Sequence, residues 1–275
     1  MMDTVITSSQ NQYVSMARSL SDRKARQKLR LYRIDGVKLL AEAISRGAHI
    51  EFLLLSDALA GGVADKANSL YGVDIFSVGA RILTVSHSIF EKLSEEQAPE
   101  GVITVVGYDS ERHRNLEGGD IDLDPCERVL LLESVRDPQN VGAIIRAAAA
   151  FSVDRIIMSR DCADIYNQKA VRASMGALFS MKIDRVDHIG GAITAISGAD
   201  RRVFAAALDK GARRLGSFEM VAGDCVVIGN EGHGLSKEAI SACTGSVYIP
   251  MSDGVESLNA ATAAAVLCWE FFGKH

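Results

Sequence analysis

The chain has 275 residues, of which 48% are hydrophobic and 24% are charged, a composition typical of a soluble globular protein long enough for two modest domains. It excludes a largely disordered chain, and the lack of an apolar run of about 20 residues argues against a membrane protein. The net charge of −5 argues against a nucleic-acid partner, but the charge is uneven, because residues 1–33 sum to +5 and the other 242 residues to −10.

The first segment of the chain joins a predicted helix to a run of basic residues. Apolar residues recur at helical spacing from Tyr13 to Leu20. Five basic residues follow, namely Arg23, Lys24, Arg26, Lys28 and Arg30. Such a run is either a solvated helix face or an RNA-contacting surface, and both interpretations stay open, since a local basic patch can contact phosphates on an acidic molecule. The N-terminus lacks the basic start and apolar centre of a signal peptide, so we expect a cytoplasmic protein.

Residues 33–106 predict a compact α/β unit. Helices are expected over 37–45, 58–71 and 86–93, and strands over 50–55, 74–78 and 101–106. The unit has no catalytic constellation, because His49 and His87 each stand alone. Residues 107–125 are polar, contain glycine and lack periodicity, which predicts a linker. We therefore divide the chain into an N-terminal domain over 1–106, a linker over 107–125 and a second domain over 126–275.

The second domain predicts a mainly parallel, doubly wound α/β sheet. Apolar strands are expected over 129–132, 155–158, 181–183, 203–207, 225–228 and 247–249, with helices between them. Several of these strands are apolar throughout, as strands covered on both faces must be. The five cysteines of the chain are widely spread and form no CxxC pair, so we expect reduced thiols and no metal site.

Two stretches of this domain carry residues suited to chemistry. Residues 130–151 contain a strand, a turn with Pro138, the N-cap candidate Asn140 and a helix whose only charge is Arg146. Arg146 either meets an anion, pairs with a carboxylate or extends to the surface, because an isolated buried guanidinium is unfavourable. Residues 226–236 run from a strand into three glycines around Asn230 and Glu231, which alone is weak evidence for a ligand.

The third stretch, residues 247–272, is a strand-to-helix junction. Residues 247–249 predict a short buried strand that Pro250 ends. Ser257 and Asn259 are N-cap candidates for the alanine-rich helix that follows. Because backbone amides and carbonyls stay open at such a junction, it is a suitable place for a ligand.

In this order, the three stretches closely resemble the motifs of the SpoU family of the SPOUT class, the S-adenosylmethionine-dependent RNA ribose 2′-O-methyltransferases. The resemblance covers the whole second domain, and the segment before it is similar to the family's ribosomal-protein-like substrate-binding domain. It implies a parallel sheet whose C-terminal segment forms a trefoil knot. It also implies a homodimer, with an active site built near the knot from both subunits.

The resemblance implies that backbone around Gly229, Ile249 and Leu258 holds S-adenosylmethionine. Five residues occupy the family's functional positions, namely Asn140, Arg146, Glu231, Ser257 and Asn259. Because the pKa of a guanidinium exceeds about 12, we expect Arg146 to clamp a substrate phosphate and stabilise the developing alkoxide rather than act as a free base. Glu231 and Asn140 would orient this arginine, and Ser257 and Asn259 would order the third loop or serve only as N-caps. The chain departs from the family at Asp253, where glycine is common.

We therefore expect an RNA 2′-O-methyltransferase, with rRNA favoured over tRNA because an added α/β domain suits a structured RNA. One alternative is a catalytically inactive RNA-binding module of the same fold. Another is a Rossmann dehydrogenase with a pyrophosphate on the glycines around Asn230. The dehydrogenase fits poorly, because its fingerprint follows the first strand of the domain.

Overall fold

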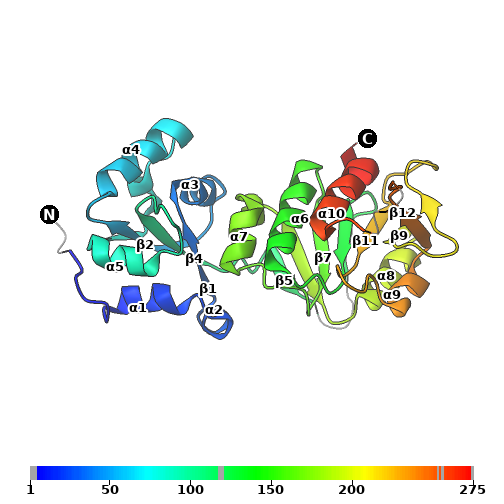
Figure 1. The fold of residues 1–275 in the computed structure, drawn as a ribbon, viewed down its shortest axis with the longest axis horizontal. Helices are drawn as coiled ribbons and strands as arrows, with labels where there is room; N and C mark the ends of the chain where they lie inside the picture. Colours follow the sequence, from blue (N-terminus) through cyan, green and yellow to red (C-terminus); the bar gives the residue numbers. More distant parts are fainter. Residues whose placement is uncertain (1–4, 117–120, 253, 255–256, 274–275) are drawn as a thin grey trace. The chain divides into compact units, whose positions relative to one another are not determined.

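The chain forms two compact units in a computed structural model that describes residues 5–116, 121–252, 254 and 257–273. The first unit consists of Met1–Asp109 with Tyr166–Phe179, and the second of Ser110–Ile165 with Ser180–His275. Each unit is built on a sheet of its own (Figure 1). Tyr166–Phe179 packs with the first unit although it lies inside the predicted second domain, and the domain limits at 106 and 125 stay predictions.

The first unit has a four-stranded sheet in the order β1-β4-β2-β3. Its strands are β1 (Leu31–Asp35), β2 (Ile50–Ser56), β3 (Arg81–Val85) and β4 (Val102–Gly107). Its helices are α1 (Gln12–Ser19), α2 (Arg23–Leu29), α3 (Val37–Ser45), α4 (Ala60–Tyr71), α5 (His87–Leu93) and α7 (Gln168–Ser174), with 3-10 turns η1 (Ile75–Val78) and η2 (Ala177–Phe179). Alternate residues of β2 face opposite sides: Phe52 packs with α1 and α5, whereas Leu53 packs with α3 and α4.

The strand predicted over 74–78 is wrong, because local capping makes this segment the 3-10 turn η1. The Asp74 side chain accepts a hydrogen bond of 2.8 Å from the backbone N–H of Phe76, and Gly79 ends the turn at a φ of +70°. The strand at this place in the chain is instead β3, which pairs parallel with β2.

The second unit has an eight-stranded sheet in the order β10-β12-β9-β11-β6-β7-β8-β5, with every neighbouring pair parallel. Its strands are β5 (His113–Asn115), β6 (Val129–Leu132), β7 (Arg155–Ser159), β8 (Lys182–Val186), β9 (Val203–Ala206), β10 (Arg213–Arg214), β11 (Cys225–Ile228) and β12 (Gly245–Tyr248). Its helices are α6 (Pro138–Ala150), α8 (Ile189–Gly198), α9 (Lys237–Ala242) and α10 (Ala260–Cys268), which continues into the π-helical turn η3 (Trp269–Gly273). The expected α/β class with a parallel sheet is confirmed, and the trefoil knot stays a prediction. β5 lies inside the predicted linker, at the edge of this sheet.

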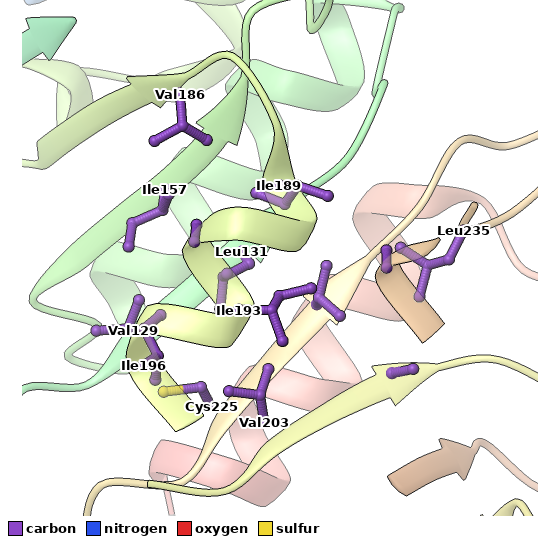
Figure 2. Close-up of a cluster of buried hydrophobic side chains, with 14 residues drawn as sticks. Val129, Leu131, Ile157, Val186, Ile189, Ile193, Ile196, Val203, Cys225 and Leu235 are labelled. Carbon is purple, nitrogen blue, oxygen red and sulfur yellow. The ribbon is translucent and has the colours of Figure 1, made fainter. Parts of the chain in front are cut away.

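Helices cover both faces of the second sheet. Val129 and Leu131 of β6 pack on one face with Ile193 of α8, as Figure 2 shows. On the other face α6 and α10 pack against each other (Figure 1). Because both faces are covered, the central strands β6, β9 and β11 are apolar at every position, as the composition of these runs predicted.

A buried ion cluster lies at the start of β7. Arg155 is 8% exposed, and its guanidinium lies 2.8 Å from Glu127 Oε1 and 2.6 Å from Asp184 Oδ2. Arg114 makes two further hydrogen bonds of 2.8 Å to the fully buried Asp184 carboxylate. Each buried charge therefore has an opposite partner, as burial requires.

We searched the described ranges for membrane-spanning helices, metal sites and reactive thiols. No helix there is long and apolar enough to cross a membrane. No group of three or more His, Cys, Asp or Glu side chains is placed there to hold a metal ion. All five cysteines are free, and burial raises the pKa of Cys225 to about 11 and that of Cys268 to about 12, so these thiols stay protonated near neutral pH.

Candidate active site

The three stretches singled out in the sequence follow β6, β11 and β12, which end at the same edge of the second sheet. From β6 the chain proceeds to β7 and β8 on one side, then returns to β9, β11 and β12 on the other. Such a reversal of strand order opens a crevice beyond the carboxyl ends of the strands, where α/β sheets bind ligands. The fold thus brings the candidate residues to a favourable place.

Side chains from all three stretches meet in a hydrogen-bonded chain, here called the amide relay. Asn259 Nδ2 donates to Asn140 Oδ1 at 2.9 Å, and Asn140 Nδ2 donates to Glu231 Oε1 at 2.6 Å. Asn259 Oδ1 also accepts hydrogen bonds from the backbone of Ala261 and Thr262, at 2.9 and 3.3 Å. Because this capping fixes the Asn259 amide, its Nδ2 must face Asn140, which turns the Asn140 amide nitrogen towards the carboxylate.

Two of the predicted N-caps are wrong. The cap of α6 is Asp137, whose side chain accepts a hydrogen bond from the N–H of Gln139, because Pro138 suits the first helical position. Asn140 instead lies within the first turn of α6, is 8% exposed and is free for the relay. Ser257 is exposed and does not cap α10, since Asn259 does.

Gly229 is required by the loop that follows β11. A β-carbon at Gly229 would lie 2.4 Å from the carbonyl carbon of Gly234 and 2.5 Å from the nitrogen of Leu235. These are backbone atoms, so the clash could not be relieved by a side-chain movement. Gly229 therefore lets the chain close on itself between Asn230 and Gly234, which exchange backbone hydrogen bonds of 3.0 and 2.9 Å.

A cavity of about 670 Å³ opens beside the third stretch. Its lining is mostly apolar and comes from the ends of β9 and β12, the loop after β12 and one face of α10. The described lining residues are Ala206, Ala207, Leu208, Val247, Tyr248, Ile249, Met251, Ser252, Gly254, Ser257, Leu258, Ala263 and Leu267. Ile249, Ser257 and Leu258 thus line the cavity, whereas Gly229 is not in its wall. Asp253 lies outside the described residues. The volume is in the range of about 300–1,000 Å³ that suits a small-molecule ligand.

Arg146 is not brought to the amide relay within this chain. It lies six positions after Asn140 on α6, so the two side chains project from different faces of the helix. Its side chain is exposed and, among the described residues, makes no hydrogen bond or ion pair. Of the open interpretations, extension to the surface is the one that this chain adopts.

Sequence reasoning missed a second polar cluster, at the loop between β6 and α6. Ser134 has a φ of +56°, and its hydroxyl donates to Asp161 Oδ2 at 2.6 Å. Burial raises the pKa of Asp161, but hydrogen bonds from Ser134, Ser159 and Arg136 outweigh it and lower the pKa of this carboxyl. The only sequence signal was a polar residue after each of two strands, which is common in any loop.

Comparison with known families matches residues 127–269, more than half of the chain, to the SpoU rRNA Methylase family. The chain belongs to the SpoU rRNA methylase family. It is therefore an enzyme that uses S-adenosylmethionine, as the three motifs predicted, and the dehydrogenase alternative is excluded. Residues 11–104 match a second family, the MRM3-like substrate binding domain.

Characterised relatives resemble this SpoU methylase over nearly its full length. It is 26% identical over 270 residues to the 23S rRNA (guanosine(2553)-2′-O)-methyltransferase RlmP of Bacillus subtilis, which covers 98% of this chain and 99% of that protein. It is 27% identical over 274 residues to a 23S rRNA (uridine(2479)-2′-O)-methyltransferase of Streptomyces viridochromogenes, with 96% and 90% covered. The solved structure of the SpoU methyltransferase AviRb from that organism, in complex with the cofactor AdoMet, matches with a TM-score of 0.81 at 25% identity, over 96% of this chain and 98% of that one.

Proposed function

We propose that this SpoU methylase transfers a methyl group from S-adenosylmethionine to a ribose 2′-hydroxyl of ribosomal RNA. The observation that carries the proposal is the amide relay, which joins the three motif stretches at the carboxyl edge of the parallel sheet. The relatives named above, two of which modify 23S rRNA at a 2′-oxygen, support the same reaction. A cytoplasmic location suits such a substrate.

The cavity suits S-adenosylmethionine because its lining is mostly apolar and is formed in part by the loop after β12. Adenosine and methionine carry no pyrophosphate, so a phosphate-binding glycine loop is not needed. Ile249 and Leu258 would hold the molecule, and Ser257 would contribute a hydroxyl at the same wall. When bound, S-adenosylmethionine supplies a methyl group on a positively charged sulfur. Gly229 would act indirectly, by letting the loop after β11 approach closely.

The remaining candidate residues would orient the ribose hydroxyl, which is a poor nucleophile at neutral pH, so positioning must supply much of the rate. Glu231 Oε1 is occupied by Asn140, whereas Oε2 of this exposed carboxylate has no hydrogen-bond partner among the described residues. Oε2 is therefore available to an arginine or to the substrate. Arg146 would clamp a phosphate and stabilise the charge that develops on the ribose oxygen.

A homodimer would account for the position of Arg146. The side chain lies away from the amide relay of its own chain and has no partner among the described residues. In a two-fold dimer built on α6, the arginine of one subunit would complete the site of its partner. Trp269, 49% exposed at the end of α10, would add apolar area to the same interface.

Ribosomal RNA is proposed over tRNA because the relatives named above act on 23S rRNA and share the first unit, and the basic surface of this unit on α2 is suited to RNA. The buried Arg26 donates two hydrogen bonds, of 2.9 and 2.8 Å, to the Leu20 and Ser21 carbonyls at the end of α1, which fixes the orientation of α2. Arg23, Lys24 and Lys28 are then exposed, with no ion pair among the described residues. Unpaired cations on a fixed helix are suited to RNA phosphates.

The reaction is tested by incubating the protein with labelled S-adenosylmethionine and either rRNA or tRNA. We expect label in rRNA, and label found only in tRNA would contradict the proposed target. Arg146→Ala should abolish transfer while cofactor affinity stays within several-fold, and full activity would refute the assigned role. RNA binding without any transfer would instead favour the inactive binding module.

The shared active site is tested by mixing two inactive variants. Arg146→Ala and Glu231→Ala would each lack activity alone. In a mixed dimer, one of the two sites would receive both an intact Arg146 and an intact Glu231, so partial activity should return. Sedimentation as a monomer, or no recovery in a purified mixed dimer, would contradict the dimeric arrangement.

A further inference from the structure

The loop between β6 and α6 is held in an unusual backbone conformation. Ser134 lies in the left-handed region at a φ of +56°, which is uncommon for a residue with a β-carbon. Three hydrogen bonds hold it there. Its N–H donates to Ser159 Oγ at 2.8 Å, its hydroxyl donates to Asp161 Oδ2 at 2.6 Å, and its carbonyl accepts from Asn230 Nδ2 at 2.8 Å. Such strain persists where the surroundings enforce it, often at functional sites.

Asp161 is the anchor of this arrangement. Its Oδ1 accepts a hydrogen bond of 2.6 Å from Ser159 Oγ, while its Oδ2 accepts the one from Ser134. The carboxylate at the exit of β7 thus fixes the loop that leaves β6. Through Asn230, the neighbour of Glu231, the same loop is joined to the loop that leaves β11.

Arg136 projects from this loop to solvent. Its Nη2 lies 3.4 Å from Asp161 Oδ2, and its side chain is 64% exposed. A guanidinium has five N–H donors, and among the described residues Asp161 is the only partner of this one. Most donors of Arg136 therefore remain available, four residues before Asn140 of the amide relay.

We propose that Arg136 contacts a phosphate of the RNA next to the methylated ribose and that Asp161 is a positioning residue that orients it. This inference rests on the proposed function. Glu231 places an exposed negative charge at the site, so RNA can approach only if cations offset the repulsion between the carboxylate and the phosphates. A planar guanidinium is suited to this role because it can bind two phosphate oxygens at once.

The first test is the Arg136→Gln variant, with Arg160→Gln as a matched control. Arg160 is also a surface arginine of the second unit, 44% exposed and 2.8 Å from the carboxylate of Asp187. Loss of one charge-assisted phosphate contact should raise KM for rRNA about tenfold and reduce the slope of log affinity against log salt by about 0.7 to 0.9. Cofactor affinity should stay within twofold, and Arg160→Gln should leave KM and the salt slope unchanged. An unchanged KM for Arg136→Gln would overturn the proposal.

The second test is a double-mutant cycle with Asp161→Asn. If Asp161 acts through Arg136, its substitution should raise KM for rRNA in the parent but have little further effect in Arg136→Gln. Equal effects in both backgrounds, or a loss of stability with KM unchanged, would show a structural role only. These outcomes are distinct from a failure of the proposed function, in which the parent protein itself would transfer no methyl group to rRNA.

Discussion

Asn259 has two separable tasks, so two substitutions should divide stability from activity. Its Oδ1 caps α10, and its Nδ2 donates to Asn140 in the amide relay. Asn259→Ala removes both tasks. Asn259→Asp keeps an oxygen for the cap but replaces the donor with a second carboxylate oxygen, which repels the Asn140 carbonyl. If the Asn140 amide then turns over, its nitrogen donates to the new carboxylate, which offsets the cost in stability, and its carbonyl faces Glu231, so the hydrogen bond to Glu231 is lost.

The magnitudes follow from these contacts. Loss of an N-cap costs about 1 kcal/mol, and loss of the hydrogen bond to Asn140 costs about 1 kcal/mol more, so Asn259→Ala should lower the free energy of unfolding by about 2 kcal/mol. Asn259→Asp should lower it by about 1 kcal/mol at most, because Asp caps as well as Asn and its charge favours a helix N-terminus. The bond from Asn140 to the charged Glu231 contributes about 1.5–3 kcal/mol, so kcat/KM should fall about 10- to 100-fold in Asn259→Asp, which loses that bond, and less in Asn259→Ala, which keeps it.

Urea unfolding followed by the fluorescence of Trp269, the one tryptophan of the chain, reports on this region, because Trp269 directly follows α10. Methyl transfer to rRNA gives the activity. Full activity of Asn259→Asp would refute the relay as a positioning device. Equal unfolding free energies for the Ala variant and the parent would refute the assigned cap.

Three further predictions concern stability. Gly229→Ala should lower the free energy of unfolding by about 1–3 kcal/mol or more, because the added β-carbon would clash with backbone atoms. Gly191→Ala in α8 is the control and should be neutral or slightly stabilising, because its β-carbon would meet open space. Urea unfolding measures both, and equal values for the two variants would contradict the close approach at Gly229. Arg155→Ala should cost about 3–5 kcal/mol, because the buried Glu127 loses its guanidinium partner while Asp184 keeps Arg114, and a small change in urea unfolding would contradict that. The pKa of Asp161 is lowered in the folded protein, so its carboxylate stabilises the fold above about pH 4, and this stabilisation is lost as the pH falls through the folded pKa. The unfolding free energies of the parent and Asp161→Asn should therefore converge on acidification. A constant difference down to about pH 2 would contradict this prediction.

The central strands of the second unit could be predicted because they are apolar at every position, as Val129–Leu132 and Cys225–Ile228 show, whereas the polar edge strands β5 and β10 could not. Their pairing could not. β9 lies between β11 and β12, and local sequence contains no sign of this order. The failure at 74–78 has a similar cause, because one side-chain cap at Asp74 outweighed a short apolar run.

The residues of the site could be predicted from the sequence, but the hydrogen bonds between them could not. Asn140, Glu231 and Asn259 were chosen on motif position, and the structure joins them by hydrogen bonds. Asn140 was predicted as an N-cap because Asn is a common cap residue. Asp137 is the cap instead, because Pro138 directly after it is suited to the first position of the helix. Ser134 could not be found, because a serine at positive φ leaves no mark in a sequence.

The segment Tyr166–Phe179 belongs to the first unit, although the chain on either side of it belongs to the second. Tyr166 stacks on Tyr108 with ring centroids 3.8 Å apart, and Gly176, at a φ of +92°, leaves no room for a side chain beside Glu42. Removal of the first 109 residues would strip this segment of its neighbours and leave aromatic surface in water. An enzyme shortened in this way would therefore tend to aggregate. Exchange of the first unit between related enzymes would succeed only if α7, which lies between β7 and β8 in the chain, were exchanged with it.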